Sequence, residues 1–450
     1  MVTERIYQNA QDIASELAWF NQILKVRSLL NAGKEADYAD VFDVPLPSYE
    51  NSSSGYAQFL NKYRLSLEER FLLIFALVPH IKPELLDVFL QKNDSINQIY
   101  TEFGGKKGKN HTGFLPTGET AMFILAGNDL ARRFSIYKCF DGSHVFAKEN
   151  ILWLDEVEKG EPFLNGAIII SREYLDLFTI GEVRKPSFSA DFPAKLLATA
   201  MEWEDLVLNP LTMNQFDEIE NWLLNEETLM NAWGMRKKLK PGYRALFYGP
   251  PGTGKSLSAA LLGKRTNRDV YRIDLSKVIS KFIGETEKNL ANIFDRAESK
   301  NWILFFDEAD ALFGKRTSIS DAHDRYANQE VSYLLQRIEE YNGLIILASN
   351  LKSNLDEAFT RRFQSMIHFP MPKPEERLQL WEKGFSGQCT LEEKINLQEI
   401  ARSYDLAGGS IINVIQHSSL MALKRGQNII QIKDIIEGVK REYHKTGRTI

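Results

Sequence analysis

The sequence predicts an α/β protein built on a parallel sheet, with a mainly α-helical domain before the sheet and a helical lid after it. Between residues 244 and 369, short apolar strands alternate with helical stretches of about ten or more residues, which is typical of a parallel sheet covered by helices on both faces. A glycine-rich loop follows the first strand and opens a helix. From Pro374 onward the apolar spacing is helical to the end.

Composition disfavours a protein with a broad nucleic-acid-binding face, a secreted protein and a membrane protein. The 450 residues include 55 Lys and Arg against 60 Asp and Glu, and the net charge of −5 disfavours a broad basic face for nucleic acid. Cys139 and Cys389 are far apart in the sequence and predict free thiols, as in a reducing compartment. The first residues lack a signal pattern, and no apolar run reaches the ~18 residues that span a bilayer. We therefore expect a cytoplasmic protein without a membrane partner.

Residues 1–180 predict a helix-rich adaptor domain that would recognise a substrate. Apolar spacing indicates one long helix over 4–31 and two packed helices over 67–90, broken at a proline. A winged-helix arrangement is one candidate for this domain. Residues 181–200 predict a linker, because Pro, Ser and charged residues mix in "GEVRKPSFSADFPAK".

Residues 201–370 predict the α/β domain, and residues 371–450 predict the lid. The expected strands are 244–248, 269–275, 302–306, 344–349 and 366–369. The expected lid helices are 374–385, 397–404, 409–424 and 431–443.

A phosphate-binding loop is predicted by "GPPGTGKS" at 249–256, which has the form G-x-x-x-x-G-K-[ST] between a strand and a helix. Its glycines allow backbone N–H groups to converge on phosphate oxygens, next to the partial positive charge of the helix N-terminus. Lys255 would reach the β- and γ-phosphates, and the Ser256 hydroxyl would bind Mg²⁺. The alternative, a chance glycine-rich turn, is disfavoured by this context. The expected ATP-binding residues are Gly249, Pro250, Pro251, Gly252, Thr253, Gly254, Lys255, Ser256 and Leu257.

Two carboxylates end the buried strand in "WILFFDEAD" at 302–310. Ligands bind at the carboxyl ends of strands in an open α/β sheet. Asp307 would hold the water shell of Mg²⁺ at the ATP site, and Glu308 would polarise the attacking water as a general base. The alternative is an acidic first helical turn. The loop at 249–256 favours the catalytic interpretation.

These motifs resemble the AAA+ ATPase family, and within it the AAA subgroup, over residues 201–450. The resemblance implies that "EWEDLVL" lines the adenine pocket, and that Asn350, which ends "LIILASN", contacts the γ-phosphate and positions water. It also implies that Arg361 and Arg362 in "NLDEAFTRRF" contain the arginine finger, without saying which of them acts. The alternatives are a turn residue for Asn350 and a solvated arginine pair. A finger from a neighbour requires head-to-tail contact, and the resemblance implies a homo-oligomeric ring, a hexamer.

Many relatives carry an arginine early in the third lid helix, at the position called sensor 2. Here "LAGGSIINVI" at 406–415 places Ile411 and Ile412 near that position. We therefore expect the lid to report the nucleotide state through packing. The Gly-Gly pair predicts a helix start.

The loop "KFIGET" at 281–286 falls where AAA remodelling enzymes carry an aromatic–hydrophobic–glycine pore loop. Phe282 and Ile283 would grip a chain through apolar contact, Gly284 would allow movement, and Lys281 would reach carbonyl or acidic groups. The alternative is that Phe282 and Ile283 fill the local core.

Together these features predict an ATP- and Mg²⁺-dependent ring motor that remodels, unfolds or disassembles a protein by threading. A nucleic-acid motor stays open, because "GGKKGKNHTG" and "RKKLK" are locally basic and aromatic residues can stack on bases. An ATP-switched assembly scaffold without threading also stays open. The whole chain resembles ATPases encoded beside bacterial contractile injection systems, through "LEERFLLIFALVPH", "GFLPTGETAMFILAG", "GKRTSISDAHDRYANQEVSYLLQRIEEY" and "RRFQSMIHFPMP", which implies components of such a machine as partners.

Overall fold

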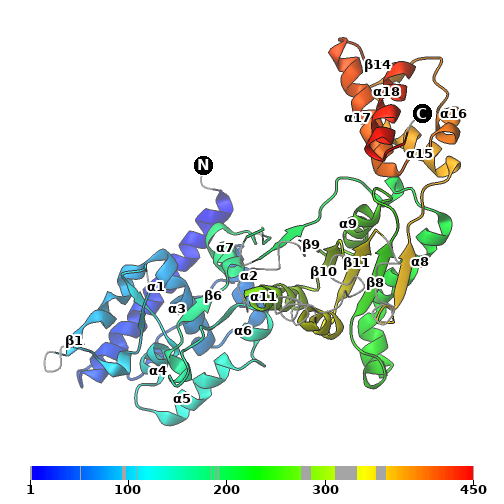
Figure 1. The fold of residues 1–450 in the computed structure, drawn as a ribbon. Coiled ribbons are helices and arrows are strands. Elements are labelled where there is room, and N and C mark those ends of the chain that lie inside the picture. The colour runs from blue at the N-terminus through cyan, green and yellow to red at the C-terminus, as the bar shows by residue number, and fades with distance from the viewer. Residues whose placement is uncertain are drawn as a thin grey trace, which may run out of the picture. The chain divides into compact units, whose positions relative to one another are not determined.

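The computed structural model divides the chain into two compact units, Met1–Lys185 and Pro186–Ile450, which we call unit 1 and unit 2 (Figure 1). It describes residues 3–448 apart from 51, 94–97, 109, 184, 187, 190–191, 275–284, 310–331 and 351–360. Each unit has its own apolar core. Across the described residues, no helix combines the length and the apolar character needed to cross a membrane.

Helices dominate unit 1, with three short antiparallel strand pairs between them. The helices are α1 (Glu4–Asn31), α2 (Gly55–Tyr63), α3 (Leu67–Ile81), α4 (Gly118–Ala126), α5 (Leu130–Tyr137), α6 (Val145–Lys148) and α7 (Arg172–Ile180). The strand pairs are β1 (Lys92–Asn93) with β2 (Gln98–Ile99), β3 (Lys106–Lys107) with β4 (Phe114–Leu115), and β5 (Leu152–Leu154) with β6 (Ile168–Ile170). The winged-helix arrangement stays a prediction.

The helix α3 runs through the core of unit 1. Its N-cap is Ser66, whose hydroxyl accepts from the Glu69 N–H while the Glu69 carboxylate accepts from the Ser66 N–H. It ends before Pro83, which disfavours helical backbone in the residue ahead of it. The sequence predicted two packed helices broken at this proline, and a second helix does follow it and packs against α3. Pro83–Leu90 (η2) is a 3₁₀ helix, the tighter form common in short connecting segments.

Unit 2 contains a six-stranded sheet with the order β12-β8-β11-β10-β9-β7. Five strands are parallel neighbours, as predicted: β8 (Tyr243–Tyr248), β9 (Val270–Asp274), β10 (Ile303–Asp307), β11 (Leu344–Ser349) and β12 (Ser365–His368). The three central strands, β8, β11 and β10, are almost continuously buried, as expected for strands covered on both faces.

The sixth strand, β7 (Ala194–Leu196), differs from the prediction, because it lies inside the segment expected to be a linker. It pairs antiparallel with β9 at the edge of the sheet. An edge strand offers unpaired backbone groups that a short segment can satisfy, and this requires no long apolar run in the sequence.

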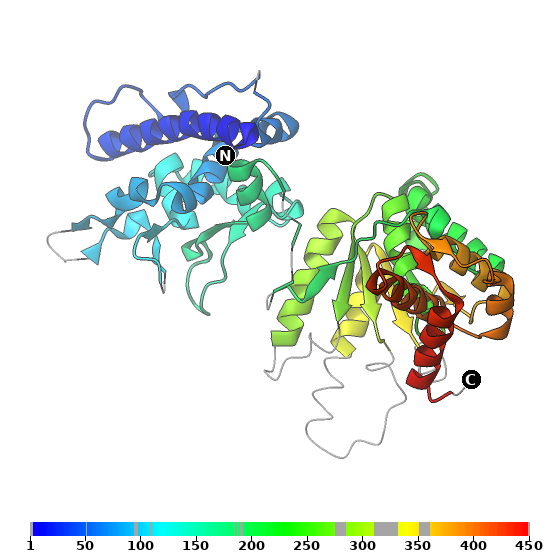
Figure 2. The same ribbon diagram turned by 90° about the horizontal axis from the view of Figure 1, so that it is seen from above.

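Helices cover both faces of the sheet (Figure 2). On one face, α8 (Pro210–Glu227) and α9 (Lys255–Arg265) pack against the strands through residues such as Phe216 and Leu262. On the other face, α11 (Glu285–Lys300) contributes Ile293 and Phe294 to a separate core. This is the layer order expected of strands that alternate with helices.

The lid follows the sheet as four helices with their own core around the buried Trp381. They are α15 (Pro374–Gly384), α16 (Leu397–Ser403), α17 (Gly408–Lys424) and α18 (Ile432–Lys445), joined by the parallel pair β13 (Thr390–Leu391) and β14 (Ile429–Ile430). All four predicted lid helices are confirmed. The helices α17 and α18 pack together at the end of the chain (Figure 1).

Candidate functional site

The candidate site lies where three neighbouring parallel strands end. In the sheet, β11 pairs with both β8 and β10. The segments that leave these strands therefore share one edge of the sheet, the edge at which α/β proteins bind ligands. The predicted phosphate loop follows β8, the predicted acidic pair ends β10, and Asn350 follows β11.

The loop after β8 has a backbone that requires glycine at two positions. A Cβ atom on Gly249 would lie 2.0 Å from the carbonyl oxygen of Phe369, so no side chain fits there. Gly254 has a φ of 101° and caps α9 without a side chain. The first N–H groups of α9 thus face the loop without a side-chain cap, which is the arrangement that binds anions at helix N-termini.

Lys255 connects the loop to the neighbouring strand. Its side chain is largely buried, and its Nζ donates to the carbonyl oxygens of Gly249 at 2.6 Å and Pro250 at 3.0 Å. The same Nζ donates to Oδ1 of Asn350 at 3.2 Å. An ammonium group is therefore held at the wall of the site by polar oxygens, within reach of a bound anion.

The acidic pair at the end of β10 has an unusual backbone. Glu308 adopts a φ of 54°, in the left-handed region that non-glycine residues seldom occupy. Such strain costs roughly 1–3 kcal/mol and clusters at active sites. The Glu308 N–H donates to Oδ1 of Asp307 at 3.0 Å, while Oδ2 of Asp307 pairs with Arg272 of β9 at 3.0 Å. These contacts fix Asp307 and leave the exposed Glu308 side chain facing a pocket.

These groups border one pocket of about 560 Å³, a volume suited to a ligand of nucleotide size. Seven of the nine predicted ATP-binding residues of the loop line it, and so do both carboxylates and Asn350. The loop residues that line it are Pro251, Gly252, Thr253, Gly254, Lys255, Ser256 and Leu257. The segment "EWEDLVL" also contributes residues from Asp205 to Leu208, where the family resemblance placed an adenine pocket.

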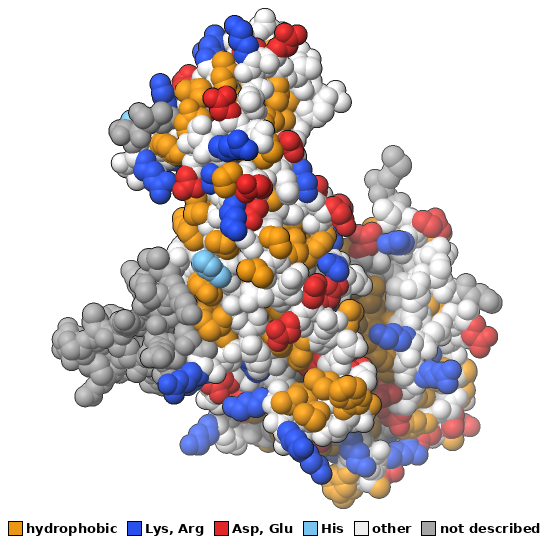
Figure 3. All heavy atoms as spheres, turned by 90° about the vertical axis from the view of Figure 1, so that its right-hand side faces the viewer, with side chains coloured by type: hydrophobic (Ala, Val, Ile, Leu, Met, Phe, Trp, Pro, Cys, Tyr) orange, Lys and Arg blue, Asp and Glu red, His pale blue; other side chains and the backbone are white. Residues whose placement is uncertain are grey.

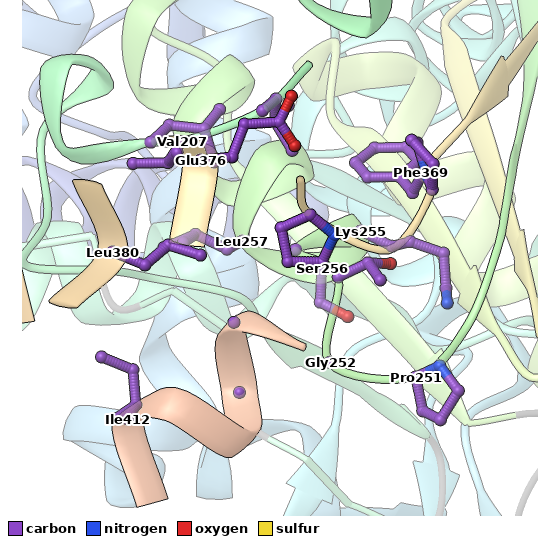
Figure 4. A pocket seen from close by; sticks show the side chains of 18 of the residues that line it. Val207, Pro251, Gly252, Lys255, Ser256, Leu257, Phe369, Glu376, Leu380 and Ile412 are labelled. Carbon is purple, nitrogen blue, oxygen red and sulfur yellow. The ribbon is translucent and has the colours of Figure 1, made fainter. Parts of the chain in front are cut away.

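The lid forms another wall of the pocket. The sequence analysis expected the lid to respond to nucleotide through packing, but it missed the backbone contact between the lid and the phosphate loop. Leu380 of α15 and Ile412 of α17 lie on one side in the view of Figure 4, with Lys255 and Phe369 on the other. The Gly409 N–H, in the first turn of α17, donates to the carbonyl oxygen of Gly252 at 2.9 Å. The Gly-Gly pair in "LAGGS" was the available signal, since two glycines before a helix allow close approach of two backbones.

The donor set fits Mg²⁺ bound together with a nucleotide. Ser256 supplies a hydroxyl and Asp307 a carboxylate, and both line the pocket. Among the described residues, no group of three or more His, Cys, Asp or Glu could hold a metal by itself. Mg²⁺ commonly uses one or two carboxylates and completes its shell with phosphates and water.

The remaining predicted residues lie elsewhere. Within the part of the chain that the structure describes, neither Arg361 nor Arg362 lines the pocket, and Arg362 forms an ion pair with Glu339. The predicted pore loop, Lys281 to Gly284, lies outside the described residues.

Comparisons with known proteins agree with this geometry. Residues 245–371 match the model of the ATPase family associated with various cellular activities (AAA). The matches support an AAA+ ATPase. They also support a P-loop α/β fold.

The relatives are, by name, a proteasome regulatory subunit and proteasome-activating nucleotidases. The 26S proteasome regulatory subunit 6A of Saccharomyces cerevisiae is 30% identical over 214 residues, 46% of this chain and 49% of that protein. The proteasome-activating nucleotidase of Methanopyrus kandleri is 30% identical over 237 residues, 51% of this chain and 53% of that protein. The proteasome-activating nucleotidase of Saccharolobus islandicus strain M.14.25 is 30% identical over 211 residues, 45% of this chain and 53% of that protein. The chain thus spans about half the length of the curated relatives it matches.

Proposed function

We propose that this chain is a cytoplasmic, ATP-hydrolysing AAA+ motor that works as a homo-oligomeric ring, a hexamer, on a protein substrate. One observation carries the proposal: a single pocket at the ends of β8, β10 and β11 holds Lys255, Asn350 and the strained Glu308 together. The names of the relatives, a proteasome regulatory subunit and proteasome-activating nucleotidases, favour a protein as substrate.

In the proposed cycle, ATP binds with its phosphates at the loop after β8. Lys255 exchanges carbonyl partners for β- and γ-phosphate oxygens, and Asn350 is then available to orient water. Glu308 takes a proton from that water as it attacks the γ-phosphate. Ser256 and Asp307 would hold Mg²⁺, which supplies positive charge to the phosphates when bound.

The arginine fingers are proposed to act between subunits. Arg361 and Arg362 lie after the undescribed segment 351–360, and neither lines the pocket of its own chain within the described residues. A finger delivered from a neighbour would make hydrolysis depend on assembly, because its charge stabilises the transferring phosphoryl group.

Mechanical work is assigned to the predicted pore loop. We propose that Phe282 and Ile283 grip the substrate, that Gly284 and Lys281 assist, and that unit 1 selects the substrate. A winged-helix form of unit 1 would suit that adaptor role. The resemblance to ATPases of contractile injection systems adds a candidate substrate, namely components of such a machine.

The test compares two variants in the same assays. Glu308→Gln should lower ATP hydrolysis by at least about 10²-fold with ATP binding retained, because it removes the general base. Phe282→Ala should retain hydrolysis but fail to unfold a folded fluorescent reporter that carries an unstructured tail. The control is Glu340→Gln, a surface carboxylate of unit 2 that accepts from Gln336. Normal hydrolysis by Glu308→Gln would overturn the catalytic assignment, and normal unfolding by Phe282→Ala would favour a scaffold without threading.

The nucleic-acid alternative is not favoured by the surface. On the face of unit 2 drawn in Figure 3, Lys and Arg are interspersed with Asp and Glu and form no continuous basic stripe. Tight DNA binding that weakens steeply with salt would support a nucleic-acid motor instead.

A further inference from the structure

Unit 1 exposes a group of large apolar side chains that the proposed ATP cycle does not use. Leu130, Phe134 and Tyr137 stand at positions i, i+4 and i+7 of α5, so they line one face of the helix. Their exposed fractions are 63%, 70% and 46%. Phe163 is 47% exposed, and its ring centroid lies 5.7 Å from that of Tyr137. We call these four residues the α5 patch.

The helix α5 buries only one of its large apolar residues. Ile136 lies in the core, whereas Leu130, Phe134 and Tyr137 face solvent. The helix lies at the rim of unit 1 (Figure 1). Clustered exposed apolar side chains on one helix face mark an interaction site, because single exposed ones are common but groups are not.

The chain segment that precedes Phe163 is acidic. The segment that leads into Phe163 exposes four carboxylates and one ammonium group, at Asp155, Glu156, Glu158, Glu161 and Lys159. The two arginines of α5 are engaged with carboxylates: Arg132 pairs with Asp40, and Arg133 pairs with Glu119 at 2.6 Å. Lys138 follows the helix and adds one positive charge without cancelling the acidic segment. A partner with positive flanks is therefore favoured.

We propose that the α5 patch binds an amphipathic helix of the protein substrate, with an apolar stripe flanked by Lys or Arg. The proposal rests on the proposed function, in that it takes the substrate to be a protein. The stripe from Leu130 to Tyr137 covers two turns, about 10 Å of helix. Helices are recognised through apolar anchors at this spacing. Phe134, the most exposed of the four, is the central anchor.

The test measures binding of two labelled helical peptides to the full chain without nucleotide. Both carry Leu at i, i+3, i+4 and i+7, and one has Lys flanks where the other has Glu. The Lys peptide should bind at least about tenfold more tightly, and its affinity should fall as salt rises. Phe134→Ser should weaken it about tenfold or more, since buried aromatic anchors dominate interfaces. Reversing Glu156, Glu158 and Glu161 to Lys should remove the preference for Lys flanks.

Matched controls change exposed residues of unit 1 outside the patch. Tyr7→Ser removes an aromatic ring that is 58% exposed on α1. The triple variant Glu35→Lys, Glu84→Lys, Asp87→Lys changes the net charge by the same amount as the patch reversal. Both controls should leave peptide binding unchanged.

Two results would overturn the proposal. One is that the Lys-flanked and Glu-flanked peptides bind with equal affinity, and the other is that Phe134→Ser binds the Lys peptide as tightly as the unchanged chain does. A change in oligomer mass caused by Phe134→Ser would instead make the patch an interface between copies, and patch-dependent binding to phosphatidylcholine vesicles would make it a membrane contact. ATP hydrolysis separates this proposal from the proposed function. A chain that hydrolyses ATP without binding the Lys peptide overturns the patch alone, whereas binding without hydrolysis overturns only the motor.

Discussion

Glu16 of unit 1 and Glu308 of unit 2 show two uses of the same side chain. Glu16 is fully buried in α1, and both of its carboxylate oxygens accept from Arg70, at 2.9 Å and 2.7 Å. The Tyr49 hydroxyl donates to the same carboxylate at 2.7 Å. Glu308 is exposed, has a left-handed backbone, and faces a pocket that Lys255 also lines.

The two glutamates show that residue type alone does not distinguish a charge that stabilises the fold from a charge that serves a site. Burial opposes the charge on Arg70, but the hydrogen bonds that Arg70 donates to Glu16, together with the negative charge of Glu16, outweigh burial and raise the pKa of Arg70 above its ordinary value. The buried charges of Glu16 and Arg70 in unit 1 therefore neutralise each other within the core. Backbone strain and exposure toward a cavity distinguish Glu308, and these are the features expected where a side chain must meet a ligand.

The largest expected effect tests whether the chemistry of unit 2 is completed by another subunit. Arg361→Ala should lower kcat for ATP hydrolysis by about 10³-fold or more, as loss of an arginine finger does in other NTPases, with ATP binding retained. Arg362→Ala should have a smaller effect, because Arg362 already pairs with Glu339 in its own chain. Steady-state hydrolysis and binding of a fluorescent nucleotide report these two quantities.

Mixing two inactive variants shows which subunit supplies the finger. Lys255→Ala subunits lack a working phosphate loop but keep Arg361, and Arg361→Ala subunits have the reverse defect. Mixed oligomers should regain part of the activity. If no mixture is active at any ratio, the finger does not act in trans.

The second effect concerns the buried pair of unit 1. Arg70→Met leaves Glu16 charged and unpaired in the core, so it should lower the free energy of unfolding of unit 1 by about 3–5 kcal/mol. Arg133→Met is the matched control, since the Arg133–Glu119 pair is about one quarter exposed and should contribute about 1 kcal/mol or less. Hydrogen exchange of α1 and α3 in urea measures both. ATP hydrolysis by Arg70→Met at the native rate is expected, and its loss would mean that the two units are not energetically separate.

Much of unit 2 could be predicted from sequence because its signals are local. Five parallel strands and four lid helices follow from apolar periodicity, and the phosphate loop follows from one contiguous motif. The strand β7 was missed, because three residues in a Pro- and Ser-rich segment carry no periodicity. Its pairing is determined by the free edge of β9, which is a property of the assembled sheet.

The residues of the candidate site also differ in whether a local sequence motif could predict them. Lys255 and Glu308 could be proposed from their motifs, but the contact between Lys255 and Asn350 depends on β11 lying beside β8, which chain order does not reveal. The lid residues that close the pocket, Leu380 and Ile412, depend on how the lid packs against the loop. In unit 1 the α5 patch follows helical spacing, yet only burial shows that this face is exposed.

The smallest effect tests whether the lid acts on the site through backbone contact at Gly409. A Cβ atom there would lie 3.2 Å from the Cα of Gly252, closer than the ~3.5–4.0 Å of ordinary carbon contacts. Gly409→Ala should therefore push α17 from the phosphate loop and raise the Kd for ATP by about tenfold, since overpacking costs roughly 1–3 kcal/mol. Gly408→Ala is the matched control, because its Cβ would lie 3.4 Å from the Gly252 carbonyl oxygen and 3.6 Å from Leu380, and it should leave the Kd unchanged. The Kd of each variant is measured with a fluorescent ATP analogue in a Glu308→Gln background, in which the nucleotide should bind without being hydrolysed. Equal Kd values for the two variants would mean that the lid reports nucleotide through its apolar wall instead of through Gly409.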